Sequence, residues 1–240
     1  MEVLNDLLGY KNLKIYQNSK WFSFSLDSVL LANFVNVNNK MKIIDFCTGN
    51  APIPLFLSTK TKSKIIGVEI QKEVYDLATK SVNLNRLNKQ IEIINMDIND
   101  IYKKYDTDEF DLITCNPPYF KLSEKSNINS NIIKAKARHE ISLNLDDIFK
   151  ISKKLLKNNG KIAIVHRSER LIDVITLMRK YNIEPKRLMF IYPNNFSKSN
   201  LFLIEGSKNG KPGLVIEKNL IVHNEDGSYT KEVLKIFNGE

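Results

Sequence analysis

Four apolar segments of strand length each end in or beside a polar residue, and this recurrence restricts the fold more than any other feature of the sequence. The four strands and the two helices between the first three are expected at residues 41–47, 53–58, 64–70, 73–87, 91–98 and 110–116. Alternation of strands and helices is typical of a parallel sheet with helices on both faces. The carboxyl ends of such strands meet at one edge, where open parallel sheets bind ligands.

The second half of the chain predicts a longer sheet with a different ending. The expected elements are a helix at 145–156 with Asn158-Asn159-Gly160 as its C-cap, a strand at 160–166, a helix at 169–181, strands at 187–192 and 201–205, a short strand near 214–216 and a helix at 230–237. The connection at 193–200 is too short for a crossover helix, so the two strands that it joins must be antiparallel. The sequence therefore predicts an α/β fold with a seven-stranded, mostly parallel sheet and an antiparallel C-terminal hairpin.

The first residues are predicted to form a small extension that precedes this sheet. Short strands are expected at 13–17 and 21–25, followed by a helix from Leu26 that is capped by Ser25 or Asp27. We therefore expect an N-terminal extension at residues 1–36 that packs on a main domain at 37–240.

The first strand runs into a glycine turn and then a helix, which is the nucleotide-binding corner of a doubly wound sheet. The turn reads Asp45-x-x-Thr48-Gly49-Asn50 and lacks the glycine-rich dinucleotide fingerprint. A carboxylate at this point would repel the negative charge of a pyrophosphate, but it can bind the ammonium group of an amino acid. The pattern therefore favours S-adenosylmethionine over NAD.

The next two strand ends also carry acids. Glu69 follows the glycine turn by about twenty residues, where a carboxylate can take both ribose hydroxyls. Asp97 could accept a hydrogen bond from the adenine amine, or it could be the N-cap of the following turn.

The fourth strand ends at Asn116-Pro117-Pro118-Tyr119. Because the prolines lack N–H donors and have a fixed φ, this turn offers rigid acceptors beside the Asn116 amide oxygen. Such acceptors suit an exocyclic amine on a planar base or amide, on which Tyr119 could stack. Asn-Pro is also a common turn dipeptide, so the four residues alone could be only a loop.

The chain is basic, with a net charge of +9 and a pI of about 9.3. This charge favours a polyanionic partner, although richness in lysine and asparagine can also reflect an AT-rich genome. Directly after the turn comes a polar segment with the basic residues Lys121, Lys125, Lys134, Lys136, Arg138 and His139. Such a run of basic residues usually just faces solvent. Because it lies directly beside the Asn116 turn, however, we predict that it contacts phosphates of the substrate.

Other classes of site are disfavoured. Cys47 and Cys115 match no zinc or redox spacing, and the three histidines are scattered, so we expect no metal. The sequence has neither a membrane-spanning apolar run nor the start of a signal peptide, which predicts a cytoplasmic location and no membrane partner.

With these motifs, the chain resembles the class I, Rossmann-like, S-adenosylmethionine-dependent methyltransferases. More narrowly, it is similar to the bacterial tRNA adenine-37 N6-methyltransferases, best known on valine tRNA. Three features carry this resemblance: residues 22–32 (Phe-Ser-Phe-Ser-Leu-Asp-Ser-Val-Leu-Leu-Ala), the Asn-Pro-Pro-Tyr turn, and Ala137-Arg138-His139-Glu140. Residues 226–230 and 237–240 also fit the Gram-positive branch, so the likeness covers nearly the whole chain.

The resemblance implies methyl transfer to the N6 amine of an adenine in a tRNA anticodon loop. The implied cofactor contacts are Asp45, Thr48, Gly49, Asn50, Glu69, Ile70, Asp97, Ile98 and Asn116. The implied catalytic residues are Asn116, Pro117, Pro118 and Tyr119, which would hold the flipped adenine. The chain departs from the family at Ala51-Pro52, where glycine is more usual, which leaves the geometry of the cofactor loop open.

Three alternatives stay open at this point. The same turn could methylate a protein glutamine amide or guanine N2, although a protein substrate gives no reason for the basic segment. A module that binds cofactor and RNA without chemistry is a second alternative, which the intact Asn116 and Tyr119 disfavour. A Rossmann oxidoreductase is a distant third, which Asp45 and the missing glycine fingerprint disfavour.

Overall fold

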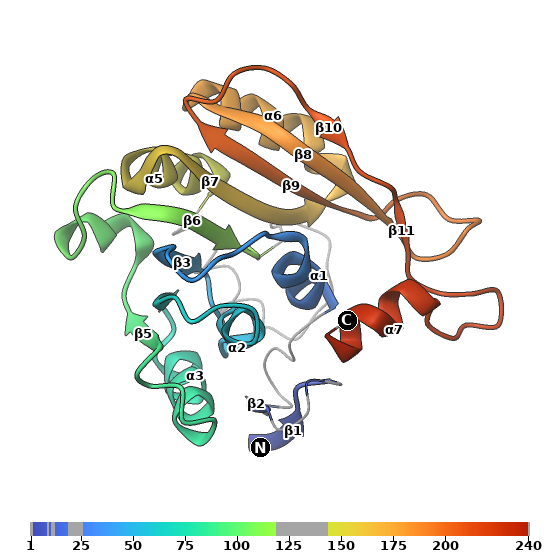
Figure 1. Cartoon of the computed structure of the whole chain (residues 1–240), viewed down its shortest axis with the longest axis horizontal. Coiled ribbons are helices and arrows are strands. Elements are labelled where there is room, and N and C mark those ends of the chain that lie inside the picture. The colour runs from blue at the N-terminus through green and yellow to red at the C-terminus, as the bar shows by residue number, and fades with distance from the viewer. Residues whose placement is uncertain (1, 9, 11–12, 19–25, 119–143, 240) are drawn as a thin grey trace, which may run out of the picture.

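The computed structural model describes residues 2–8, 10, 13–18, 26–118 and 144–239. A nine-stranded sheet has the order β10-β8-β9-β7-β6-β3-β4-β5, with β11 also paired to β8 (Figure 1). The strands are β3 (Ile43–Phe46), β4 (Ile65–Glu69), β5 (Ile91–Asn95), β6 (Phe110–Cys115), β7 (Leu156–Arg167), β8 (Ile183–Tyr192), β9 (Leu201–Lys208), β10 (Val215–Ile216) and β11 (Leu220–Ile221).

The predicted fold class is confirmed by the strand directions. Strands β3 to β7 are parallel, whereas β9 lies antiparallel between β7 and β8. The short connection at 193–200 forces this reversal. The two-residue strands β10 and β11 extend the sheet along β8. The short strand predicted near 214–216 is β10, whereas β11 was not predicted.

Helices cover both faces of the sheet (Figure 1). The helices are α1 (Leu26–Phe34), α2 (Pro52–Ser58), α3 (Lys72–Leu84), α5 (Leu145–Leu155), α6 (Leu171–Lys180) and α7 (Lys231–Asn238), with short 3₁₀ helices at Ile98–Lys103 and Ser168–Arg170. Successive strand residues alternate between two buried apolar clusters: Ile43 and Ile65 belong to one, and Ile44 and Ile66 to the other. Both faces are therefore core, as expected of a parallel sheet.

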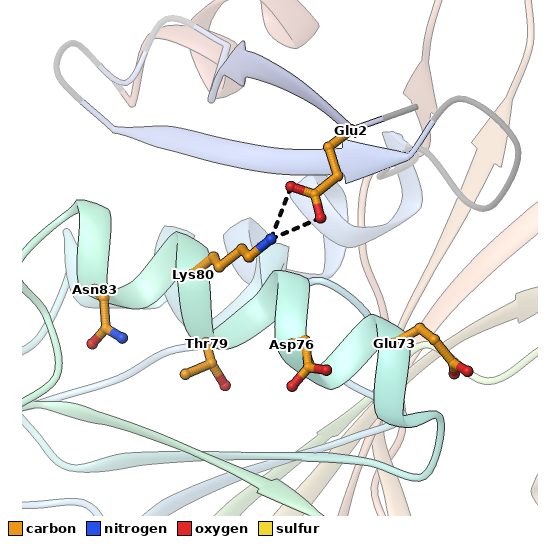
Figure 2. A pocket seen from close by; sticks show the side chains of 6 residues that line it. All are labelled: Glu2, Glu73, Asp76, Thr79, Lys80 and Asn83. Atoms are coloured by element: carbon orange, nitrogen blue, oxygen red, sulfur yellow. Dashed lines mark hydrogen bonds and ion pairs between the residues drawn. The ribbon is translucent and has the colours of Figure 1, made fainter.

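A separate antiparallel pair, β1 (Glu2–Asp6) and β2 (Lys14–Asn18), lies along α3. The Tyr16 N–H donates to Ser81 Oγ over 3.0 Å, and Glu2 pairs with Lys80 at 2.7 Å (Figure 2). The strand expected at 13–17 is thus present, whereas β1 was not predicted. The strand expected at 21–25 lies outside the described residues.

The predicted C-cap at Asn158-Asn159-Gly160 is wrong. Helix α5 ends at Leu155, and Leu156 is already extended, with φ −69° and ψ 135°. Leu156 is buried and pairs with Phe110, so burial of its side chain draws the backbone into the sheet. The register shifts over the following residues, where Asn159 has φ 63°. The asparagine and glycine run therefore forms an irregularity within β7 instead of closing a helix.

Candidate active site at the carboxyl edge of the sheet

The turn between β3 and α2 contains three residues in the left-handed conformation. Cys47, Gly49 and Ala51 have φ values of 54°, 59° and 70°. The Thr48 N–H donates to Val68 O over 2.9 Å, which fastens the turn to the end of β4. Ala51, where the resemblance leads us to expect glycine, still adopts the left-handed geometry, so the alanine accommodates this turn at some cost in backbone strain.

Asp45 is fully buried under this turn and accepts two short hydrogen bonds. Thr48 Oγ1 donates to one carboxylate oxygen and Thr114 Oγ1 to the other, each over 2.6 Å. Burial raises the pKa of Asp45 to about 7, and the nearby Glu69 adds to this rise while both threonines oppose it. The Asp45 carboxyl, buried beneath the turn, therefore titrates near neutral pH.

The raised pKa predicts how stability depends on pH. Because the pKa of Asp45 rises from about 3.9 in the unfolded chain to about 7 in the folded one, the folded state binds the extra proton. Its contribution to the free energy of unfolding is greatest below about pH 4 and is lost as the pH rises to about 7, by about 1–4 kcal/mol. Asp45→Asn should remove this slope, measured by urea unfolding at several pH values.

The effect of Asp45 is read from the difference in free energy of unfolding between the wild type and Asp45→Asn at each pH. The difference is needed because His166 makes the wild-type stability change with pH in the opposite direction. Burial lowers the pKa of His166 to about 4, so its contribution to stability is lost as the pH falls below about 6.5. Parallel stability curves for the wild type and Asp45→Asn would contradict the expected effect.

Glu69 joins the turn to the end of β4. One of its oxygens accepts from the Gly49 N–H over 3.0 Å and the other from the Gln71 N–H over 2.9 Å. The side chain is 5% exposed, and burial raises its pKa. The backbone N–H groups of Gly49, Gln71 and Ile70 fix the carboxylate at the edge of the sheet.

Gly67 explains how Thr48 fits against β4. A Cβ at Gly67 would lie 2.8 Å from Thr48 Oγ1 and 2.9 Å from Ile93 Cδ1. We expect Gly67→Ala to lower the free energy of unfolding by about 1–3 kcal/mol, because the added methyl group would force both Thr48 and Ile93 to move within a packed core. Chemical denaturation measures the change, and a value within about 0.5 kcal/mol of wild type would show that Thr48 moves freely.

Asp97 follows β5 and caps the 3₁₀ helix that begins at Ile98. Its Oδ1 accepts from the Asn99 N–H over 2.9 Å and from Asn99 Nδ2 over 3.1 Å. The N-cap interpretation is therefore correct, and a ligand role at Oδ2 remains a prediction. Ile98 is buried and Ile70 is exposed at the same edge.

Asn116 lies immediately after β6, and Cys115 pairs with Phe46 of β3, so Asn116 stands beside the turn that starts at Cys47. Its Nδ2 donates to Ser28 Oγ of α1 over 3.1 Å, and Ser28 is buried. This bond fixes the plane of the amide, whose acceptor oxygen is on the opposite branch. Sequence reasoning missed Ser28 as a site residue, 88 residues from Asn116. The available signal was its place within residues 22–32, one of the segments that carry the resemblance.

Asn50 is also oriented by a distant residue, because its Nδ2 donates to Tyr16 O over 2.9 Å. Of the proline pair, Pro117 is buried and Pro118 exposed. The predicted residues Tyr119, Lys121, Lys125, Lys134, Lys136, Arg138 and His139 lie outside the described residues. The structure thus brings together the residues of the glycine turn, Glu69 and Asn116, and Asp97 lies further along the same edge.

The part of the chain that the structure describes contains no group of three histidine, cysteine or acidic residues that could hold a metal ion. None of its helices has the length and apolar character needed to cross a membrane.

Figure 2 shows a hollow on the flank of α3, formed with β1. Its lining residues are Glu2, Glu73, Asp76, Thr79, Lys80 and Asn83. The Glu2–Lys80 ion pair spans it, and none of the predicted site residues lines it. It is therefore separate from the candidate site.

Comparison with known proteins gives a consistent picture. The family described as "Methyltransferase small domain" matches residues 17–182. A tRNA1(Val) (adenine(37)-N6)-methyltransferase of Shewanella woodyi is 24% identical over 238 residues, 96% of each chain. The protein of the same name from Trichodesmium erythraeum is 28% identical, over 95% of this chain and 94% of its own.

Among solved structures, a predicted O-methyltransferase of Agrobacterium tumefaciens has a similar fold. The TM-score is 0.71 at 16% identity, and the match covers 89% of this chain and 96% of that protein. At this level of identity the likeness shows the fold alone.

Proposed function

Because the chain belongs to the methyltransferase small domain family, we propose that it transfers a methyl group from S-adenosylmethionine to the N6 amine of adenine 37 in a valine tRNA. The single observation that carries this proposal is the position of Asn116. The amide stands at the end of β6, beside the turn that Asp45, Gly49 and Glu69 build. The names of the two curated relatives support the choice of tRNA and of adenine 37.

The residues at the sheet edge fit S-adenosylmethionine. Among the described residues, no atom lies within 4 Å of a Cβ placed at Gly49, which leaves room for a ligand above the turn. We assign the ribose hydroxyls to Glu69 and the amino acid end of the cofactor to Asp45, Thr48, Gly49 and Asn50. Ile70, Asp97 and Ile98 would contact the adenine ring of the cofactor, and Asn116 would border its methyl group. The bound cofactor supplies an electrophilic methyl group.

The chain itself would contribute positioning. Asn116 Oδ1 and the Pro117 carbonyl would accept the two N6 hydrogens, which holds the amine with its lone pair toward the methyl group. Tyr119 would stack on the adenine. The N6 lone pair would form the bond to the methyl carbon while the methyl–sulfur bond breaks and leaves its electron pair on sulfur. The surplus N6 proton would then leave to solvent, so no base of shifted pKa is required.

The substrate must present an adenine outside a duplex, because flipping a base costs a few kcal/mol and costs least in a single-stranded loop. An anticodon loop meets this condition. The net charge of +9 supports a polyanionic partner, and the basic residues from Lys121 to His139 are proposed to contact its phosphates.

The proposed function is tested by incubating the protein with labelled S-adenosylmethionine and tRNA that lacks its own N6-methyladenosine. Nucleoside mass spectrometry should find the label in N6-methyladenosine, and sequencing of the labelled fragment should place it at position 37. Label in N2-methylguanosine would identify the other base. Label in protein glutamine, with none in RNA, would favour the amide alternative, and cofactor binding without transfer would favour the binding module.

A further inference from the structure

The connection between β8 and β9, residues 193–200, presents an aromatic ring to solvent. Phe196 is 79% exposed, the largest exposed fraction of any large apolar side chain among the described residues. Large aromatic rings are usually buried, and an isolated exposed apolar residue needs no explanation by itself. Its surroundings decide whether this one has a role.

Hydrogen bonds within the connection hold its shape. Asn194 Oδ1 accepts from the Phe196 N–H over 3.0 Å and from Ser197 Oγ over 2.8 Å. Ser199 Oγ bonds to the carbonyl of Ile191 over 3.0 Å. The ring is therefore displayed by an ordered backbone, so little conformational entropy remains to be lost when a partner covers it.

The connection opens at the same edge of the sheet as the candidate active site. Strand β8 runs parallel to β6, and in Figure 1 the connection turns back beside β11, on the side toward which β6 points. The Ser168 N–H, just after β7, donates to Asn200 O over 3.1 Å. Strand β7 is the direct neighbour of β6, and β9 follows β7, so β9 lies two strand spacings, about 10 Å, to the side of β6. Leu201, at the base of the connection, pairs with Arg167, three residues beyond the Ile164 that pairs with Cys115, so this base also stands about 10 Å further along the strand direction.

The connection and the segments bonded to it carry charges of both signs. Lys198 within the connection is exposed, as is Arg167, which pairs with Leu201 at its base. The turn after β11 carries Glu225 and Asp226 and is tied to the connection by the His223 N–H, which donates to the Pro193 carbonyl over 2.9 Å. Charge alone therefore does not identify the partner, and the exposed ring and its position at this edge are the features that bear on it.

We propose that Phe196 is a stacking platform for an unpaired base of the RNA loop next to the methylated adenine. The inference rests on the proposed function, since it assumes an RNA substrate at the Asn116 turn. RNA is recognised largely through unstacked loop bases that stack on aromatic side chains, and such stacking tolerates any base. A flipped adenine at Asn116 leaves its neighbours without a stacking partner, and Phe196 would supply one at this edge.

Three variants test the proposal. In Phe196→Ala, KM for an anticodon stem–loop of valine tRNA should rise about 10-fold with kcat unchanged, because truncation removes one stacked base. Phe196→Tyr keeps the flat ring and should stay near wild type. Ile172→Ala is the matched control, since Ile172 on α6 is also strongly exposed, at 73%, and should leave KM unchanged.

An abasic scan of the stem–loop locates the partner. At one loop position other than 37, loss of the base should raise KM for the wild type and have no further effect on Phe196→Ala. Equal KM values for wild type and Phe196→Ala would overturn the inference, as would a Phe196→Tyr variant as weak as Phe196→Ala. If the wild type methylates no RNA at all, the proposed function itself fails, so the two failures are distinguishable.

Discussion

Replacement of Asn116 by alanine is expected to lower the rate of methyl transfer to tRNA by about 10²–10³-fold, the usual cost of losing one positioned polar group at a reacting centre. The amide is held by Ser28 at 3.1 Å, and the proposed acceptor oxygen disappears with the side chain. Single-turnover transfer of labelled methyl to tRNA measures the effect. Affinity for the cofactor should change far less, because Glu69 and the glycine turn are untouched.

A matched control is Asn158→Ala, which removes an asparagine from β7 that bonds to Asn209, away from the site. It should transfer methyl groups at the wild-type rate. Ser28→Ala should give an intermediate rate, since the amide remains but loses its orienting partner. An Asn116→Ala enzyme with a rate near wild type would contradict the role assigned to the turn.

The second large effect is expected on cofactor binding. Glu69→Ala should raise the dissociation constant for S-adenosylmethionine about 100-fold or more, because two hydrogen bonds from ribose hydroxyls to a buried carboxylate would be lost. The same change leaves the Gly49 and Gln71 N–H groups without their acceptor, so the turn loses part of its support. Isothermal titration calorimetry of the purified variants measures the affinity.

Glu92→Ala provides the comparison for Glu69→Ala, because Glu92 is an exposed glutamate of β5 that pairs with Lys104 at 2.7 Å. It should bind the cofactor as the wild type does. Thermal unfolding without cofactor would show whether Glu69→Ala is folded. A folded Glu69→Ala protein with near wild-type affinity would remove Glu69 from the proposed ribose site.

Much of the fold could be predicted because its signals are local. The apolar strand segments, the acids that follow them and the short connection at 193–200 each carry their meaning within a few residues. The same locality explains the error after α5, where Asn158-Asn159-Gly160 has the composition of a helix cap. Burial of Leu156 against Phe110 overrode that propensity, and this pairing depends on a strand more than forty residues earlier.

Several residues of the candidate site could be predicted from the sequence, but the hydrogen bonds that orient their side chains could not. Asp45 and Glu69 were expected from their places at strand ends, but the bonds that Thr114 donates to Asp45 and that Asn50 donates to the Tyr16 carbonyl join elements far apart in the chain. Only the folded structure reveals such partners. Asp97 shows the opposite case, since its local role as an N-cap could be foreseen and is present.

The bond between Ser28 and Asn116 bears on attempts to build chimeric enzymes. A designer who transplants the Asn-Pro-Pro turn onto another parallel-sheet scaffold moves the amide but leaves behind the hydroxyl that orients it. The donor fragment should therefore include α1, or the recipient should already present a serine at the equivalent height above the sheet. Libraries that vary α1 around Ser28 offer a way to retune which planar amine the turn accepts without altering the turn itself.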